Sequence, residues 1–307
     1  MTYTNYTKGN IYDRSQINVS AENVPTNRLF TAYPNEEHVF EDREGNMSFY
    51  QITRAVEQKK QTTLDMTVLS LIATFGTCAM TSRAIDEMLK LLKIEYSKNM
   101  LESSMNRLHR YHLINFSHFK KCGEDVLKTR IITLTTYGSQ LAKSIGINHR
   151  FKALETASMT AAVAKSRAQT AQLIVNYLKN IDVEDFQVRP VYKKNADLGE
   201  IVRPAAAIKI GGEYINFEVP RRYDNDWKEE FMGKLNRYKL VFDKMPALII
   251  NGEDEAMNLE IHRMLKENGF DYEVLFTDDL AMFGNGFRYS LYSFDEDGNR
   301  MNFEIFS

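Results

Sequence analysis

The chain has 307 residues, of which 43% are hydrophobic and 26% are charged, and these fractions are close to those of soluble globular proteins. This length predicts about two domains, and the composition excludes a wholly disordered chain. Two cysteines, Cys78 and Cys122, exclude a scaffold held by several disulfides and fit a reducing compartment. No apolar run is long enough to cross a membrane, and residues 1–10 lack the apolar core of a signal peptide. We therefore expect a cytoplasmic protein without a membrane partner.

Charge is distributed unevenly along the chain. Residues 51–150 carry 15 Lys and Arg against 8 Asp and Glu, a net charge of +7. Residues 221–307 carry 11 against 18, a net charge of −7. A basic block in an otherwise acidic chain is typical of a protein that binds a polyanion, most often nucleic acid. The alternative is an ordinary solvated surface of mixed charge.

Residues 1–58 are predicted to form a flexible polar segment. Residues 1–27 are rich in Thr, Asn, Tyr and Ser and contain few aliphatic side chains to bury. Residues 38–53 predict a short hairpin that turns at Glu44-Gly45-Asn46.

The next segment, residues 59–148, predicts three helices, two strands and a short last helix. The first helix ends at Gly76, Thr81 or Ser82 caps the second, and the third runs from Ser97 to about Tyr111. A polar turn then joins the two strands, and Thr135 or Thr136 caps the last helix. Three helices followed by a two-stranded hairpin are typical of a winged helix-turn-helix domain.

The third helix of this segment has one apolar face and one polar face. At about 100° per residue, Leu101, Met105 and Leu108 share the apolar face. The opposite face holds Asn, Ser and Arg, which read base edges, and the hairpin holds Lys and Arg, which bind phosphates. A winged helix that contacts only other proteins is the alternative. The candidate DNA-contacting residues are Asn99, Ser103, Asn106, Arg107 and Arg110 in the helix and Lys120, Lys121, Lys128 and Arg130 in the hairpin.

Residues 149–181 predict one long Ala-rich linker helix. Eight of its residues alternate at spacings of three and four, as in the seam of a coiled coil. The small seam residues favour close approach of a second copy, so a homodimer is expected; packing on the same chain is the alternative. The seam comprises Leu154, Ala157, Ala161, Ala164, Ala168, Ala171, Val175 and Leu178.

Residues 182–307 alternate between strands and helices and end in a hairpin. The predicted strands are FQVRPVY, AAAIKI, EYINFEV, ALIIN and YEVLF, with a helix at about 227–242 before ALIIN and a helix at about 255–267 after it. This order of strand, strand, strand, helix, strand, helix, strand predicts a mixed sheet flanked by helices, so the chain as a whole is of the α+β or α/β class. Residues 134–142, which read LTTYGSQLA, also resemble a segment that follows the hairpin in many bacterial winged-helix regulators.

Four segments of the second half share a recognisable pattern: Arg203-Pro204, Tyr214 to Val219, Lys234-Leu235 with Tyr238, and Pro246 to Ile250. This pattern resembles the replication-relaxation family of Gram-positive plasmids and mobile elements. In that family a winged helix precedes an R-P-D strand, a strand that ends in aromatic-x-E-V-D, and a K-L-x-x-Y helix. The resemblance implies a DNA-binding accessory role in plasmid replication or transfer, a replication or transfer protein as partner, and a C-terminal domain similar to the PD-(D/E)xK nuclease fold.

The nuclease-like positions are degenerate. A metal-dependent nuclease of this fold needs an acid on one strand and E-x-K on the next, because the acids hold Mg²⁺ and the metal activates water. Here the first strand reads Ala205-Ala206-Ala207, and the second reads Glu218-Val219-Pro220 without a lysine. Glu218 and Lys234 are therefore expected to be remnants, with no metal, no cofactor and no catalysis. The alternative is a Mg²⁺-dependent DNA nuclease centred on Glu218.

A zinc site is a further candidate. His109, His112, His118 and Cys122 are suitable ligand types, but they run from a helix through a strand into a turn, so we expect packed or DNA-proximal histidines. The expected protein is a non-enzymatic, sequence-specific double-stranded DNA-binding accessory protein of a bacterial plasmid, mobile element or phage, acting in replication, transfer or transcription control. A protein–protein interaction module is the remaining alternative.

Overall fold

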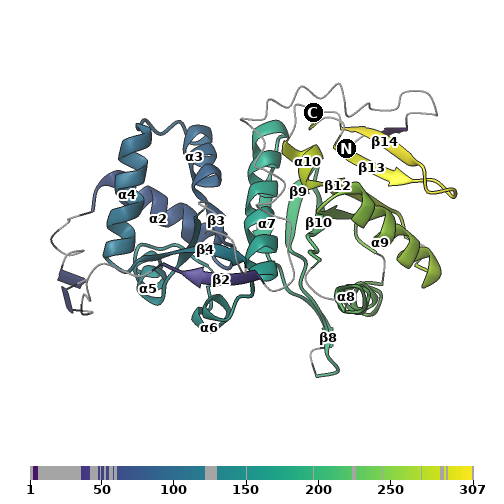
Figure 1. The fold of residues 1–307 in the computed structure, drawn as a ribbon, viewed down its shortest axis with the longest axis horizontal. Helices are drawn as coiled ribbons and strands as arrows, with labels where there is room; N and C mark the ends of the chain where they lie inside the picture. Colours follow the sequence, from purple (N-terminus) through teal and green to yellow (C-terminus); the bar gives the residue numbers. More distant parts are fainter. Residues whose placement is uncertain are drawn as a thin grey trace. The chain divides into compact units, whose positions relative to one another are not determined.

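The chain forms two compact units, Asn35–Val175 and Met1–Pro34 with Asn176–Ser307. The computed structural model describes residues 3–5, 36–41, 48, 50–51, 53–54, 58, 61–121, 130–149, 151–195, 197–222, 226–243, 245–270, 272–283, 287 and 290–305. Helices and three sheets alternate along the chain, which confirms the mixed α and β class (Figure 1). Among the helices described, none combines the length and the apolar character needed to cross a membrane.

Three helices follow β2 (Glu36–Phe40) in the first unit, and the sequence predicted the end of the first, the start of the second and both ends of the third. They are α2 (Thr63–Phe75), α3 (Ser82–Leu91) and α4 (Lys98–Arg110). The side chains of Thr81 and Ser97 accept hydrogen bonds from backbone N–H groups of the following turn, which confirms both as N-caps. Gly76 ends α2 with a positive φ of 48°, a conformation that glycine adopts without strain.

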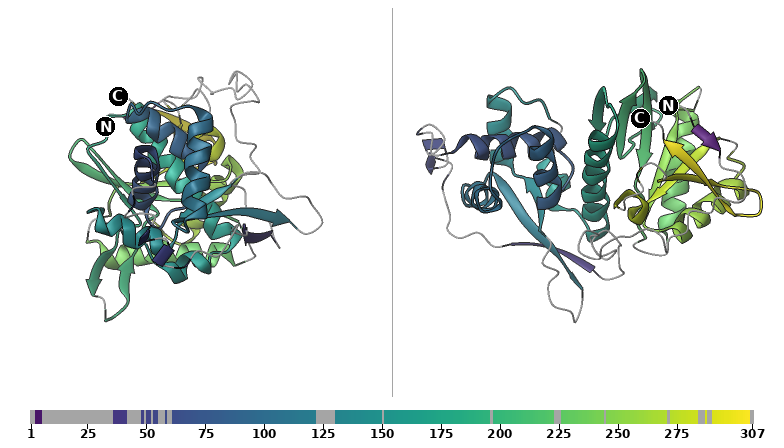
Figure 2. Two further views of the ribbon diagram at one scale, coloured as in Figure 1. Left: turned by 90° about the vertical axis from the view of Figure 1, so that its left-hand side faces the viewer. Right: turned by 90° about the horizontal axis from the view of Figure 1, so that it is seen from above.

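A four-stranded sheet completes this unit, in the order β2-β4-β5-β3. The predicted hairpin is formed by β4 (Ile114–Lys121) and β5 (Ile131–Leu134), and β3 (Met80–Thr81) pairs with β5. Strand β2 (Glu36–Phe40) pairs antiparallel with the outer edge of β4 (Figure 2). The expectation of a flexible segment and a local hairpin there is wrong for these five residues. Local alternation predicts a strand but not its partner, and the predicted turn at 44–46 lies outside the described residues.

Two helices replace the single linker helix that the sequence predicted. After α5 (Thr136–Ser144), residues Ala153–Ala157 form α6 and residues Ala161–Asn180 form α7. The chain leaves the helical path between them, where the Thr160 hydroxyl accepts a hydrogen bond from the backbone N–H of Val163. A threonine that satisfies an N–H of a first turn starts a new helix, and the Ala-rich composition masked this start. The segment is also not a separate domain, because the two compact units divide α7 after Val175.

The second unit is built on an eight-stranded sheet in the order β1-β14-β13-β12-β11-β10-β9-β6. Strands β10, β11 and β12 are mutually parallel, and the remaining pairs are antiparallel. The edge strand β1 was not predicted, since its partner lies some 300 residues further along the chain. The strands are β1 (Tyr3–Asn5), β6 (Asp185–Val188), β9 (Ala206–Ile210), β10 (Glu213–Glu218), β11 (Leu248–Gly252), β12 (Val274–Asp278), β13 (Leu291–Phe294) and β14 (Arg300–Ile305).

Helices α8 (Trp227–Val241) and α9 (Glu255–Glu267) pack over one face of this sheet, and a short α10 (Asp279–Phe283) follows β12 (Figure 1). The predicted helices at about 227–242 and 255–267 are therefore confirmed. The predicted strand FQVRPVY is wrong after Val188, where β6 ends, because Arg189 has a positive φ of 48° and Pro190 follows it. Its last residue, Tyr192, begins a separate strand, β7 (Tyr192–Asn195), which pairs with β8 (Glu200–Val202).

Candidate nucleic-acid interface

Helix α4 separates its apolar and polar side chains as the sequence predicted. Leu101, Met105 and Leu108 are buried, and the helix packs against α2. The opposite side exposes two amides, a hydroxyl and a guanidinium, with the carboxylate of Glu102 on its flank. We call this surface the outer face of α4; it comprises Asn99, Ser103, Asn106 and Arg110.

Arg107 was expected on the same face but has a different role. Its Nε and Nη2 donate to Asp65 at 3.0 and 2.8 Å, and the Asp65 side chain is fully buried. The same carboxylate accepts the backbone N–H of Thr62 and so caps α2. Burial alone would raise the pKa of Asp65, but hydrogen bonds from Arg107, Ser104 and Thr62 hold it below its usual value. Arg107 therefore joins α4 to α2, and we remove it from the outer face.

The hairpin presents less positive charge than its sequence suggests. Lys120 is exposed on β4, but Glu37 of β2 lies directly opposite it in the register. Arg130 donates from Nε to Glu41 at 3.0 Å, and its guanidinium lies 4.7 Å from the centre of the Phe116 ring. The acidic residues of β2 and the adjoining Glu41 therefore offset part of the positive charge of the hairpin. This effect was not predicted, because residues 1–58 were expected to be a flexible segment apart from the hairpin.

The other two hairpin candidates are Lys121 and Lys128. The backbone of Lys121 pairs with Glu36 at the end of β4. Lys128 lies outside the described residues, as does the predicted turn after Lys121.

A hollow of about 600 Å³ lies beside the outer face of α4. Asn99 and Ser103 line it together with Leu64, Ile94 and Met100. Met100 is 51% exposed, and Leu92, which directly follows α3, is 50% exposed. These exposed apolar side chains were not predicted, because only polar groups were expected on this surface. A mixture of amide, hydroxyl and apolar groups suits base edges and thymine methyl groups, and it also suits a protein partner.

The candidate zinc ligands have other contacts. The His109 ring stacks on Phe116 with the ring centres 4.3 Å apart, and His118 Nδ1 lies 4.0 Å from Glu41 Oε1. His112 is buried with a positive φ of 57°, and its carbonyl accepts the Thr135 hydroxyl. Cys122 lies outside the described residues. Within the ranges that the structure describes, no three His, Cys, Asp or Glu side chains lie close enough together to hold a metal ion.

In the second unit, Glu218 ends β10 and is only 2% exposed. The Tyr238 hydroxyl donates to Glu218 Oε1 at 2.7 Å, and Lys234 Nζ donates to Oε2 at 2.5 Å. Both donors come from α8, so each carboxylate oxygen joins the sheet to this helix. The neighbouring strand β9 begins with Ala206 and Ala207, which pair with Phe217 and Asn216 of β10, and Ala205 directly precedes it. These three positions therefore carry small apolar side chains.

A buried ionic network that the sequence analysis missed lies next to this site, at the carboxyl ends of β11 and β12. Arg221 Nη2 donates to Asp279 Oδ1 at 2.9 Å, and Asn251 Nδ2 donates to the same oxygen at 3.2 Å. Burial raises the pKa of Asp279 to about 7; Arg221 opposes this rise, and Glu253 and Asp278 add to it. The sequence contained one signal for this network, the acidic residues at the ends of β11 and β12. Their partner, Arg221, follows a different strand, β10, and so could not be recognised from that signal.

The predicted dimer seam is interrupted between α6 and α7, and its residues differ in burial. Leu154 in α6 is 85% exposed, and Ala157 is exposed. The seam residues of α7 from Ala161 to Val175 are instead buried within the single chain. A stripe of small apolar residues has the same spacing whether it contacts a second copy or its own chain, so the spacing could not distinguish the two. A homodimer stays a prediction.

Comparison with known proteins identifies no relative. The chain matches no model of a known family, no curated protein and no solved structure. The relation to the replication-relaxation family therefore stays a prediction that rests on the matching residues in the second unit.

Proposed function

We propose that the first unit is a winged helix-turn-helix module that binds double-stranded DNA through the outer face of α4. The order helix, strand, helix, helix, strand, strand supports this proposal, with β3 added to the hairpin as a third strand. The main support is the outer face of α4, where Asn and Arg side chains stand exposed on a helix that is anchored behind by Leu101 and Leu108.

We infer that the second unit is a nuclease-like fold without catalytic activity. Strands β6, β9 and β10 are antiparallel, α8 follows them, and β11 then pairs parallel with β10, an order that resembles the nuclease-like core. Both oxygens of Glu218 are engaged by α8, which supports a structural role for this carboxylate. The whole protein would then be a DNA-binding accessory protein of a plasmid, mobile element or phage, with a replication or transfer protein as partner.

The proposal is tested by the affinity of the full chain for DNA. A preferred duplex is first selected from random-sequence DNA, and its affinity is then measured by fluorescence anisotropy. Arg110→Ala and Asn106→Ala should each weaken binding by about 1–3 kcal/mol, since each removes a contact to a base edge. Arg237→Ala, an exposed arginine of α8, is the matched control and should bind as the wild type does.

Failure would take one of two forms. Selection that enriches no sequence would contradict specific recognition. Unchanged affinity in both α4 variants would contradict the placement of the interface, while leaving open DNA binding elsewhere on the chain.

The alternative nuclease activity is tested separately with supercoiled and linear DNA in Mg²⁺ or Mn²⁺. We expect no cleavage, because the lysine and the second acid of the nuclease pattern are replaced. Metal-dependent cleavage that disappears in Glu218→Gln would make the second unit an enzyme.

A protein-interaction module is the second candidate function, and the exposed Leu92 and Met100 favour it. Met100 belongs to α4 and lines the same hollow as Asn99 and Ser103, so a partner that covers it would use the surface that we assign to DNA. Salt-dependent DNA binding by the wild type separates the two proposals, because apolar contacts to a protein do not release counterions.

A further inference from the structure

Apolar side chains from three segments line the hollow beside the outer face of α4. Leu64 of α2 is buried, whereas Ile94, in the turn before α4, and Met100 are exposed. Met100 is the third residue of α4, and its backbone N–H donates to the hydroxyl of Ser97, the N-cap of the helix. The methionine therefore lies in the first turn of α4, and this end of a recognition helix is the part that contacts base edges.

The charges of the lining do not suit a phosphate. Among the ten described residues that line the hollow, Arg107 is the one cation, and its guanidinium donates to Asp65 through two nitrogens. Glu95, which is exposed, adds a negative charge. Phosphates are bound by Lys and Arg side chains that neutralise them, so a duplex on this surface would place bases rather than backbone over the hollow.

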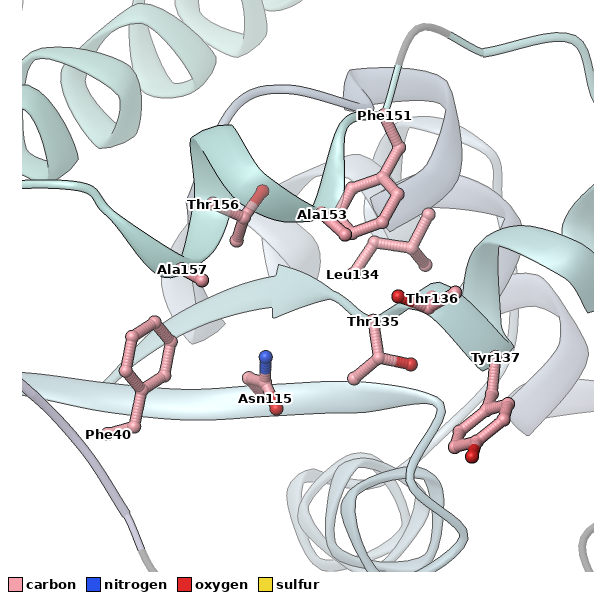
Figure 3. A pocket seen from close by; sticks show the side chains of 10 residues that line it. All are labelled: Phe40, Asn115, Leu134, Thr135, Thr136, Tyr137, Phe151, Ala153, Thr156 and Ala157. Carbon is pink, nitrogen blue, oxygen red and sulfur yellow. The ribbon is translucent and has the colours of Figure 1, made fainter. Parts of the chain in front are cut away.

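The position of this hollow restricts its ligand in a way that lining chemistry alone does not. A second hollow of the first unit, of about 320 Å³, lies between β4 and α6 (Figure 3). Its side chains Asn115, Tyr137 and Thr156 already have partners, and the remaining lining does not identify a ligand. The hollow beside α4 is instead walled by the helix that we assign to the major groove, so a bound duplex would present base edges to it.

We propose that the hollow beside α4 receives the C5-methyl group of a thymine, with Met100 as the residue that contacts it. In the major groove, the thymine methyl is the apolar group that base edges present. Methionine is flexible and polarisable, so its exposed side chain can adjust to a methyl group at this position. This inference rests on the proposed DNA-binding function and deepens it, because it names a base that α4 selects by apolar contact.

The test removes the methyl group from the DNA and changes nothing else. In the duplex selected by the full chain, each thymine is replaced in turn by deoxyuridine, which keeps the base pair and its hydrogen-bonding groups. We expect the affinity to fall about fourfold at one or two positions, the value for one buried methyl group, and to stay unchanged at the others.

Two variants connect this loss to the hollow. Met100→Ala should bind the selected duplex about fourfold more weakly, and deoxyuridine at the sensitive positions should cause no further loss, because the contact is already absent. Leu154→Ala removes an exposed apolar side chain of α6 that does not line this hollow, and it should show the wild-type loss. The deoxyuridine series on the wild type keeps the test decisive if Met100→Ala does not fold.

The source of the methyl group is checked at the cytosines of the same duplex. 5-Methylcytosine presents the same group from a G·C pair, and we expect no comparable gain in affinity at these positions. A gain at a cytosine without a loss at any thymine would assign the hollow to methylated cytosine and overturn the proposal.

Two further results would overturn it. Wild-type affinity that tolerates deoxyuridine at every thymine would leave Met100 to a protein partner, while the selected duplex would still support DNA binding by α4. A loss that persists undiminished in Met100→Ala would place the methyl contact elsewhere on the interface. Selection that enriches no duplex would instead contradict the proposed function, and this inference with it.

Discussion

The outer face of α4 and the carboxyl ends of β10, β11 and β12 both carry polar side chains, but these side chains differ in burial. On α4, Asn106 and Arg110 are exposed. At the strand ends, Glu218, Arg221 and Asp279 are buried and are engaged with partners from the same unit. The same residue types thus serve different purposes, because a buried charge needs an internal partner whereas an exposed one is available to an external partner.

This difference depends on contacts that sequence motifs alone do not contain. Glu218 and Lys234 occupy the degenerate nuclease-like positions, and in the structure they bind each other and join β10 to α8. Arg107 makes the same point within the first unit, since it belongs to α4 but bonds to a buried carboxylate. Substitutions of side chains that bond to partners within the chain should therefore change the stability of the fold. Substitutions on the outer face of α4 should instead change DNA binding.

The largest expected effect on stability is at Gly138 of α5 in the first unit. A Cβ added there would lie 1.9 Å from the backbone oxygen of Leu113, and backbone cannot move aside as a flexible side chain does. Gly138→Ala should lower the free energy of unfolding by about 3 kcal/mol or more. Gly233→Ala in α8 is the control, because an added Cβ meets nothing there and alanine favours helix by about 0.5–1 kcal/mol. Thermal unfolding followed by circular dichroism measures both, and equal stability of the two variants would contradict this packing.

Removal of Arg107 should have the next largest effect. Arg107→Ala leaves the buried carboxylate of Asp65 without its guanidinium and should cost about 2–3 kcal/mol of stability. This is less than for a fully buried pair, because the Arg107 side chain is 34% exposed and the backbone N–H of Thr62 remains as a donor. Arg110→Ala, one turn further on, should leave the urea midpoint almost unchanged. Similar midpoints for the two variants would mean that Arg107 belongs to the outer face after all.

The buried network of the second unit should make its stability depend on pH. The pKa of Asp279 is raised to about 7, so the folded chain holds a proton that the unfolded chain releases above about pH 4. The contribution of Asp279 to the free energy of unfolding therefore falls as pH rises from about 4 to 7, by at most about 1.4 kcal/mol per pH unit. Trp227, the only tryptophan, lies in α8 and reports urea unfolding of this unit by its fluorescence.

His262 requires a control in that experiment. Burial lowers its pKa, so its contribution to stability rises with pH up to about 6.5, opposite to that of Asp279. Asp279→Asn retains the effect of His262, and the wild type should lose stability relative to this variant between pH 5 and 7. A constant difference between the two proteins would show that Asp279 does not titrate in this range.

The sequence predicted those parts of the fold that local chemistry determines. Thr81, Ser97 and Thr135 cap helices at the expected places, and α9 spans the expected residues. A capping side chain acts on a backbone group only a few residues away, so its effect can be recognised without knowledge of the rest of the fold.

Contacts between distant residues could not be predicted in this way. Asp65 meets Arg107 across 42 residues, and β2 pairs with β4 across about 80. Both contacts bear on the candidate site. The first engages Arg107, which was predicted to contact DNA, and the second places acidic residues beside the hairpin. Neither has a periodic pattern or a local motif, and each depends on which surfaces the folded unit brings together.

The smallest expected effect concerns Lys120 of the hairpin and provides the most direct test of DNA binding by the first unit. The affinity of the full chain for duplex DNA is measured over a range of salt concentrations for the wild type, Lys120→Ala and Lys194→Ala, the last being an exposed lysine of β7 in the second unit. We expect the wild-type affinity to fall steeply with salt, and the slope of log K against log[salt] to decrease by about 0.9 in Lys120→Ala and to stay unchanged in Lys194→Ala. DNA affinity that is independent of salt, or a slope altered by Lys194→Ala and not by Lys120→Ala, would contradict the assignment of the first unit as the DNA-binding part of the chain.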